Sequence, residues 1–255
     1  MTSAFVPSKR LDPKQAALRP DFIHLLNVIK PWKTEGGVIP PSQNGDFVAQ
    51  METVLDIYKL PYDPLYPLVC MGESPKHLIG ETKLPIPAQP GRLARYDYEY
   101  SRKGVCKIFI ATEPLMGKRI VRVTSNRKKQ DWAKFLEEIA RKYRHAERIT
   151  LVMDNFNTHK PGSLYETFKP KKARTLLDRF EFIHTPMHGS WLNMPEIELR
   201  VLSNQCLNRR IDTMTEERRQ VGAWEKERNN KEAIINRRFT TENARIKSKR
   251  LYPSV

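Results

Sequence analysis

The sequence contains no run of about eighteen consecutive apolar residues, the length that a membrane-spanning helix needs. Residues 1–10 also lack the apolar centre of a secretory signal peptide. We therefore expect a protein that works in the cytosol or on the nucleoid, without a membrane partner. Its 255 residues, 39% of them hydrophobic, suffice for one large or two small folded domains.

Cysteine is scarce as well. The three cysteines, Cys70, Cys106 and Cys206, are odd in number, far apart and each set among apolar neighbours. This pattern excludes a disulfide framework and is typical of buried, reduced thiols. His184 and His188 do not have metal-ligand spacing with any cysteine, so the sequence predicts no zinc site.

Acidic residues are too few to balance the basic ones. Lysine and arginine total 45 against 29 for aspartate and glutamate, a formal net charge of +16 that is spread along the chain. A polyanion is the simplest partner, and we expect nucleic acid, although charge alone does not distinguish DNA from RNA. The basic runs 127–129, 169–172 and 245–250 are each short enough to be ordinary solvated surface. Together they are the candidates for phosphate contacts.

The first half of the chain alternates proline-rich connections with apolar segments. Residues 1–41 contain several prolines and little periodicity, which is typical of an extended arm. Ser42 is a candidate cap for a helix whose apolar residues fall at helical spacing. Residues 66–71 form a nearly continuous apolar run, which predicts a buried strand that ends at Gly72.

A second proline-rich connection leads to three β-rich stretches, at residues 95–101, 105–111 and 119–124. Gly104 and Gly117 stand between them, where hairpin turns are expected. These stretches predict an antiparallel meander.

In the second half, helices and strands alternate. Apolar residues at helical spacing predict a helix over residues 129–144, and short apolar runs predict strands at 149–153 and 180–184. Pro195 suits the first turn of a further helix. A meander followed by crossover helices fits an α/β fold with a mixed sheet flanked by helices, the order that a ribonuclease-H-like domain requires.

Carboxylates stand where this fold would collect them. Asp154 directly follows the most hydrophobic predicted strand, although a turn or helix-cap role would explain it equally well. Glu196 lies in the first turn of the helix that starts at Pro195, and Glu198 is its rival. A two-residue step turns about 200° around a helix, so only one of the two can meet Asp154. The pattern alone leaves that choice open.

Residues 151–159 (LVMDNFNTH) and 188–198 (HGSWLNMPEIE) resemble the insertion-sequence six-thirty family, bacterial DDE transposases related to mariner. The likeness runs from about Pro31 to the C-terminus. Its further segments are 62–64 (YDP), 96–100 (YDYEY), 224–229 (WEKERN) and 238–253 (RFTTENARIKSKRLYP).

This resemblance implies a catalytic domain in which three carboxylates hold two Mg²⁺ or Mn²⁺ ions for cleavage and transfer of DNA strands. It makes Asp154 the second carboxylate and Glu196 the third, through an Asn-x-x-Glu pattern, and it sets Glu198 aside. The chain would then divide into an arm over residues 1–41, a catalytic domain over 42–210 and a C-terminal helical extension over 211–255. The resemblance also implies transposon-end and target DNA as partners and the bacterial cytosol as the location. Whether the chain forms a homodimer stays open.

The sequence departs from the family at the first carboxylate, because Gly72 stands where the resemblance expects an aspartate. Glu73 is adjacent, but strand side chains alternate between faces, so Glu73 should point away from the metals. An aspartate at position 72 would share the face of Leu68 and Cys70 and point toward Asp154. We therefore expect impaired catalysis. The alternatives are an inactive DNA-binding transposase remnant and a ribonuclease or resolvase-type nuclease with the same fold.

Three other features have two interpretations each. The family carries a helix-turn-helix region that binds the transposon ends, and Leu25 to Lys33 resembles only the linker that follows it, so we expect little sequence-specific end binding. His159 is either a loop histidine that bonds backbone or a phosphate contact. Trp191 either stacks on a nucleotide or, as we expect, anchors the loop before Glu196.

Overall fold

The computed structural model describes residues 43–155 and 159–254. The expected arm over residues 1–41, with its linker-like stretch Leu25 to Lys33, lies outside the described residues. Within the described ranges, no helix is long and apolar enough to cross a membrane.

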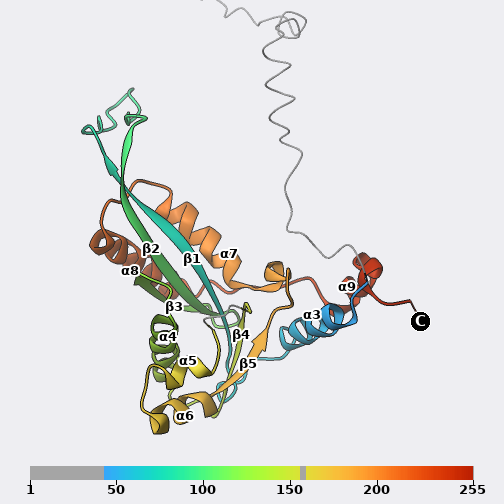
Figure 1. Cartoon of the computed structure of the whole chain (residues 1–255). Helices are drawn as coiled ribbons and strands as arrows, with labels where there is room; N and C mark the ends of the chain where they lie inside the picture. The colour runs from blue at the N-terminus through green and yellow to red at the C-terminus, as the bar shows by residue number, and fades with distance from the viewer. Residues whose placement is uncertain (1–42, 156–158, 255) are drawn as a thin grey trace, which may run out of the picture. The chain divides into compact units, whose positions relative to one another are not determined.

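The centre of the fold is a five-stranded mixed sheet (Figure 1). Its strands lie in the order β3-β2-β1-β4-β5. β2 runs antiparallel to β1 and β3, whereas β4 runs parallel to β1 and β5. This confirms the predicted ribonuclease-H-like arrangement of a meander extended by two parallel crossover strands. The strands are β1 Leu68–Glu81, β2 Tyr100–Glu113, β3 Lys118–Thr124, β4 Ile149–Met153 and β5 Phe180–His184.

The first two strands are longer than the sequence predicted. The prediction that β1 ends at Gly72 is wrong, because β1 pairs with β2 from Cys70, opposite Thr112, to Glu81, opposite Tyr100. This continuous ladder outweighs the local glycine and proline signals. The stretches predicted separately at 95–101 and 105–111 are not two strands. Residues 95–99 belong to the connection before β2, and residues 100–111 lie within β2, which forms a long ribbon with β1 (Figure 1).

Of the two glycines assigned to hairpin turns, one is confirmed. Gly117, with φ +61°, connects β2 to β3. Gly104, with φ +119°, instead lies inside β2, opposite Leu78 at the shift of register between Leu78 and Ile79. A glycine with positive φ is thus as compatible with an irregular strand as with a turn.

Seven α-helices are assigned within the described residues. α3 begins after Asn44, whose side chain accepts a hydrogen bond from the Phe47 N–H at 3.0 Å. The prediction of a cap at Ser42 is therefore wrong, because Asn44 caps the helix. The helices are α3 Gly45–Ile57, α4 Lys129–Lys142, α5 Gly162–Tyr165, α6 Pro170–Asp178, α7 Pro195–Leu202, α8 Met214–Asn230 and α9 Thr241–Lys247, with short turns at η1 Ser190–Leu192, η2 Ser203–Leu207 and η3 Lys249–Leu251.

Both faces of the sheet are covered. On one face α4, α5 and α6 bury a core that includes Met71 and Met153. On the other face α3 and α9 cover Cys70 and Val152, and α7 and α8 cover the adjoining part of β2. Cys70, Cys106 and Cys206 are buried free thiols on this second side, as predicted. The alternation along β1 and β4 therefore decides toward which helices each strand-end side chain points.

Candidate active site

Asp154 follows the last residue of β4, on the face opposite Met153 and therefore on the side of α3 and α7. Its carboxylate is half-buried beside the end of β5. There the Thr185 hydroxyl donates a 2.8 Å hydrogen bond to Asp154 Oδ1. Two parallel strands thus deliver a carboxylate and its hydrogen-bond donor to the same edge of the sheet.

The surroundings hold the pKa of Asp154 above its ordinary value. Burial is the largest cause; hydrogen bonds from Thr185 and Asn193 and the charge of His159 oppose it, and the charge of Glu73 adds to it. A carboxylate whose pKa stays raised despite several donors is short of positive charge.

Glu196 lies one residue into α7 and is exposed. Its pKa is raised, first by partial burial of its carboxylate and then by the negative charge of Asp154. The two carboxylates are therefore close enough to repel each other. Glu73 likewise acts on Asp154 through its charge, so Asp154 has an electrostatic interaction with both of these glutamates.

Glu198 has a different environment. It is fully buried, and its oxygens accept hydrogen bonds from Arg119 Nε and Nη2, each at 2.8 Å. Arg228 of α8 adds contacts at 3.2 and 3.0 Å. These guanidinium groups lower the pKa of Glu198, although burial by itself raises it. Glu198 is thus ion-paired with Arg119 of β3 and Arg228 of α8. Of the two glutamates in the first turn of α7, Glu196 is therefore the one that can face Asp154.

Gly72 lies in β1 on the face covered by α7. A Cβ atom added at Gly72 would meet Pro195 Cβ at 2.8 Å and Leu199 Cδ1 at 3.6 Å. The position faces α7, the helix that carries Glu196. The space, however, is filled by the first turn of that helix. Any side chain at position 72 requires Pro195 to move, which the sequence did not reveal.

Glu73, the next residue, lies on the opposite face of the sheet. Its Oε1 accepts a 2.6 Å hydrogen bond from Arg127 Nη1, and its Oε2 lies 3.5 Å from His159 Nε2. Its side chain is only 6% exposed. These partners lower the pKa of Glu73 although burial opposes them. Glu73 is a paired carboxylate on the α4 side, although its charge also acts on Asp154.

His159 and Trp191 both serve packing in this structure. His159 is buried and stacks on Trp132 of α4, with ring centroids 5.5 Å apart and an interplanar angle of 15°. Trp191 packs edge-on against Phe239 at 5.8 Å and belongs to the core beneath α3. The expectation that Trp191 anchors the loop before Glu196 agrees with this contact.

Two residues beside Asp154 were not predicted as site residues. Thr185 follows β5, and its position after a strand end was the signal that could have identified it. Asn193 is buried, and its Nδ2 donates a 2.9 Å hydrogen bond to the Met71 carbonyl. Asn193 thus ties the loop before α7 to β1 next to Gly72, and its side chain also acts on Asp154.

A hollow of about 220 Å³ lies beside Asp154, lined also by residues of the loop after β5. Carboxylate oxygens are the ligands that Mg²⁺ and Mn²⁺ prefer, so Asp154 and Glu196 are suitable donors. However, within residues 43–155 and 159–254 no group of three His, Cys, Asp or Glu side chains is placed to hold one metal ion.

The basic runs are partly engaged in ion pairs. Lys129 pairs with Glu166 at 2.6 Å and Lys172 pairs with Glu137 at 2.6 Å. Such exposed pairs contribute about 0–1 kcal/mol each, so phosphate groups can compete with them. The runs therefore stay candidates for contacts with a polyanion.

Among solved structures, the Mos1 transposase paired-end complex with left transposon end matches with a TM-score of 0.49 and 14% identity, over 91% of this chain and 77% of that chain. The Mos1 mariner paired-end complex with Mn matches with a TM-score of 0.49 and 13% identity, over 91% and 78%. The corresponding complex with Mg gives 0.49 and 13%, over 94% and 74%.

No curated protein matches the chain. The model of the DDE superfamily endonuclease family matches residues 67–217, which is more than half of the sequence and includes all five strands as well as Asp154 and Glu196. The chain belongs to the DDE superfamily of endonucleases.

Proposed function

We propose that this chain is the catalytic domain of a transposase that acts on DNA in the bacterial cytosol, and that its catalysis is impaired. One observation carries the proposal: in a DDE-family chain, Asp154 and Glu196 are close enough to interact electrostatically, while a glycine occupies the strand position expected to supply the first carboxylate. Of the three carboxylate positions that the family resemblance implies, two thus have a carboxylate and one has a glycine.

Membership of the insertion-sequence six-thirty family is part of this proposal. Its support is the order of the motifs in the sequence, from residues 62–64 to residues 238–253. We also propose the division into an arm over 1–41, a catalytic domain over 42–210 and a C-terminal extension over 211–255. α8 and α9 of that extension pack on β3 and α3, so the extension contributes to the same core.

Asp154 and Glu196 would hold the divalent ions. Bound Mg²⁺ or Mn²⁺ supplies activation of a hydroxyl nucleophile and stabilisation of the departing oxygen in phosphoryl transfer. Two dications beside two carboxylates would leave uncompensated positive charge, which disfavours binding of the second ion. Loss of an outer-shell partner already lowers metal affinity or activity about 10- to 100-fold, so loss of a direct ligand should cost more.

Glu73 does not supply the missing ligand. Recruiting it would require breaking its bonds with Arg127 and His159 and turning the side chain to the other face of β1. Moreover, the space on that other face beside position 72 is occupied by Pro195.

Nicking of supercoiled DNA in Mn²⁺ tests the proposal through position 72. Since any side chain there displaces Pro195, Gly72→Asp is compared with Gly72→Ala, which adds the Cβ without the carboxylate. Both are also made in a Pro195→Gly background, which removes the atom at 2.8 Å. We expect cleavage only with aspartate at position 72, and its loss when Asp154→Asn is added. Wild-type protein that already cleaves as fast as the aspartate variants, with dependence on Asp154, would show that the site is complete.

A second candidate function is a DNA-binding subunit without chemistry. The same glycine favours it, since a chain can bind phosphates through its basic surface without holding metal ions. DNA binding combined with no cleavage by any aspartate variant that remains folded would favour this second function.

A further inference from the structure

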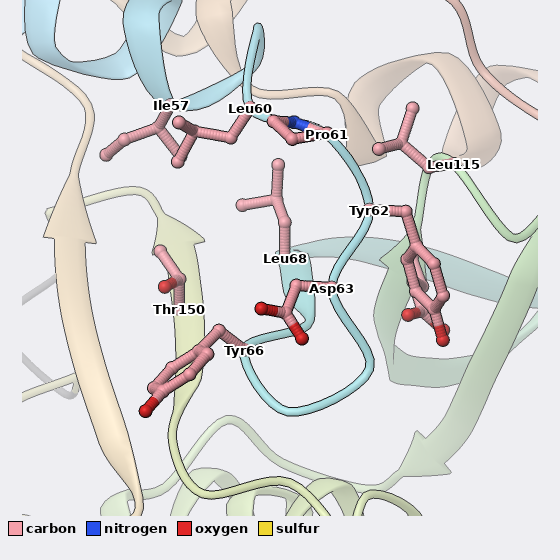
Figure 2. A pocket seen from close by; sticks show the side chains of 10 residues that line it. Ile57, Leu60, Pro61, Tyr62, Asp63, Tyr66, Leu68, Leu115 and Thr150 are labelled. Carbon is pink, nitrogen blue, oxygen red and sulfur yellow. The ribbon is translucent and has the colours of Figure 1, made fainter.

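A cavity of about 240 Å³ opens at the end of the sheet opposite to Asp154. It lies beside Leu68, the first residue of β1, and Thr150, the second residue of β4, whereas Asp154 follows the last residue of β4. Figure 2 shows the side chains around it. Tyr62 and Asp63 line this cavity, so the YDP segment lies here and not at the candidate active site.

One wall of the cavity carries a carboxylate that lacks part of its hydrogen bonding. Glu113, the last residue of β2, is only 5% exposed. Its Oε2 accepts a 3.1 Å hydrogen bond from the Tyr143 hydroxyl, whereas its Oε1 is buried without a hydrogen-bond partner. Burial raises the pKa of Glu113, and the charges of Lys118 and Lys142 act against that rise, although the Lys118 Nζ itself binds Glu232 at 2.6 Å. A buried, unpartnered carboxylate oxygen is costly, and a cation in the cavity would offset that cost.

A second carboxylate faces the same space. Asp63 Oδ1 accepts a 2.8 Å hydrogen bond from the Leu65 N–H, which fixes the turn before β1. Figure 2 shows the Asp63 carboxylate among Leu68, Tyr66 and Thr150. The charges of Glu113 and then Asp63 raise the pKa of Tyr62, after burial as the largest cause. Both carboxylates therefore act on one tyrosine at the rim.

The rest of the lining is apolar and aromatic. Leu60 is 58% exposed and Tyr66 49%, and Tyr62 and Leu115 are also open to solvent. Tyrosine rings and leucine side chains suit the alkyl part of a ligand, and the ring faces suit a cation. The cavity is smaller than the roughly 300–1,000 Å³ of sites for drug-sized molecules, so it fits a group of about one side chain.

We propose that this cavity binds an alkyl cation, a guanidinium or ammonium group on an apolar stem, with Glu113 and Asp63 receiving the charge and the leucine and tyrosine side chains covering the stem. Arginine or lysine side chains of a protein segment and free alkylamines share this chemistry. The site is independent of the proposed catalysis, because it lies at the other end of the strands and uses none of the same residues.

Binding to the full chain is measured by methyl chemical shifts, with n-butylguanidinium as the cation and n-butylurea as its uncharged counterpart. Glu113→Gln keeps an acceptor for Tyr143, and Asp63→Asn keeps the acceptor for the Leu65 N–H, so each variant removes charge and preserves shape. Glu166→Gln, which removes a carboxylate from the exposed pair with Lys129, is the matched control. Acetyl-Gly-Arg-Gly-amide tests whether the cation is held better on a peptide.

We expect n-butylguanidinium to shift the methyl signals of Leu60, Leu68 and Leu115, and n-butylurea to leave them unchanged. Each of the two cavity variants should weaken binding about tenfold, the loss typical of a charge-assisted hydrogen bond, and Glu166→Gln should not. Tighter binding of the arginine peptide would identify a protein side chain as the occupant, and equal binding a free alkyl cation. Equal binding of n-butylurea, or affinity unchanged in both cavity variants, would overturn the proposal.

Discussion

At the scale of single residues, Pro195 of α7 fills the space beside Gly72, so position 72 has no room for a side chain. We expect Gly72→Ala to lower the free energy of unfolding by about 1–3 kcal/mol, because its Cβ would lie 2.8 Å from Pro195 Cβ in a packed interior. Gly222→Ala in α8 is the control: no atom lies within 4 Å of its added Cβ, and alanine should stabilise that helix by about 0.5–1 kcal/mol. Urea denaturation measures both. An unchanged or higher stability of Gly72→Ala would mean that α7 does not pack on β1 as described.

The raised pKa values of Asp154 and Glu196 give a pH dependence with a definite sign. The folded protein holds these protons more tightly than the unfolded chain, so both groups destabilise the fold as pH rises through their raised pKa values. The penalty is absent below the ordinary carboxyl range. Asp154→Asn should therefore stabilise the protein at neutral pH, by about 1.4 kcal/mol for each pKa unit of the shift, and the gain should vanish on acidification.

Urea denaturation at several pH values measures this gain. The exposed Asp178, paired with Arg174 on α6, supplies the control Asp178→Asn, which should change stability by no more than about 0.5 kcal/mol. A destabilised Asp154→Asn at neutral pH would mean that cationic neighbours outweigh burial at this site.

At the scale of elements, the cluster of Arg119, Glu198 and Arg228 ties α7 to β3 and α8. Glu198→Gln should cost about 3–5 kcal/mol, because it leaves a buried guanidinium without its counter-charge. Replacing all three side chains with Met or Leu should recover most of that loss, since a buried ion cluster and a packed apolar cluster of similar volume are often equally stable. Urea denaturation distinguishes these outcomes. A triple variant less stable than Glu198→Gln would show that the ion cluster itself stabilises the fold.

The elements that could be predicted from sequence are those with a strong local period. The five apolar residues of β4, the run at β5 and the one-sided pattern of α4 predicted their bounds almost exactly. The length of β1 and β2 could not be predicted in this way, because it depends on pairing between residues distant in sequence. Gly104 could not be placed from the sequence for the same reason. It was predicted in a hairpin turn, but its positive φ belongs to an irregularity in the pairing of β2 with β1.

The candidate site was predictable to the same extent. Asp154 and the first turn of α7 could be singled out because strand ends and helix starts collect at one edge of a mixed sheet, but the choice of Glu196 over Glu198 rested on the family resemblance. The ion partners of Glu198 and Glu73 come from β3, from α8 and from the connection between β3 and α4, and no sequence spacing links them. The close approach of Pro195 to Gly72 likewise follows only from the packing of α7.

At the scale of the whole molecule, the chain has 45 basic and 29 acidic residues, a net charge of +16. This excess of positive charge predicts affinity for duplex DNA of any sequence. The logarithm of the affinity should fall with the logarithm of salt concentration with a slope of about −0.9 for each phosphate neutralised. Fluorescence anisotropy with two duplexes of unrelated sequence measures it. A flat salt dependence, or binding of only one duplex, would contradict binding through phosphates alone.

The central proposal is that Asp154 and Glu196 bind metal together in a site that lacks a third carboxylate. Mn²⁺ binding to the full chain, measured by calorimetry or electron paramagnetic resonance, tests this most directly. We expect one weakly held ion in the wild type, lost in Asp154→Asn and in Glu196→Gln and kept in Glu198→Asp, which retains a negative charge beside Arg119 and Arg228. Two tightly held ions, or one ion whose affinity does not change in Asp154→Asn, would contradict it.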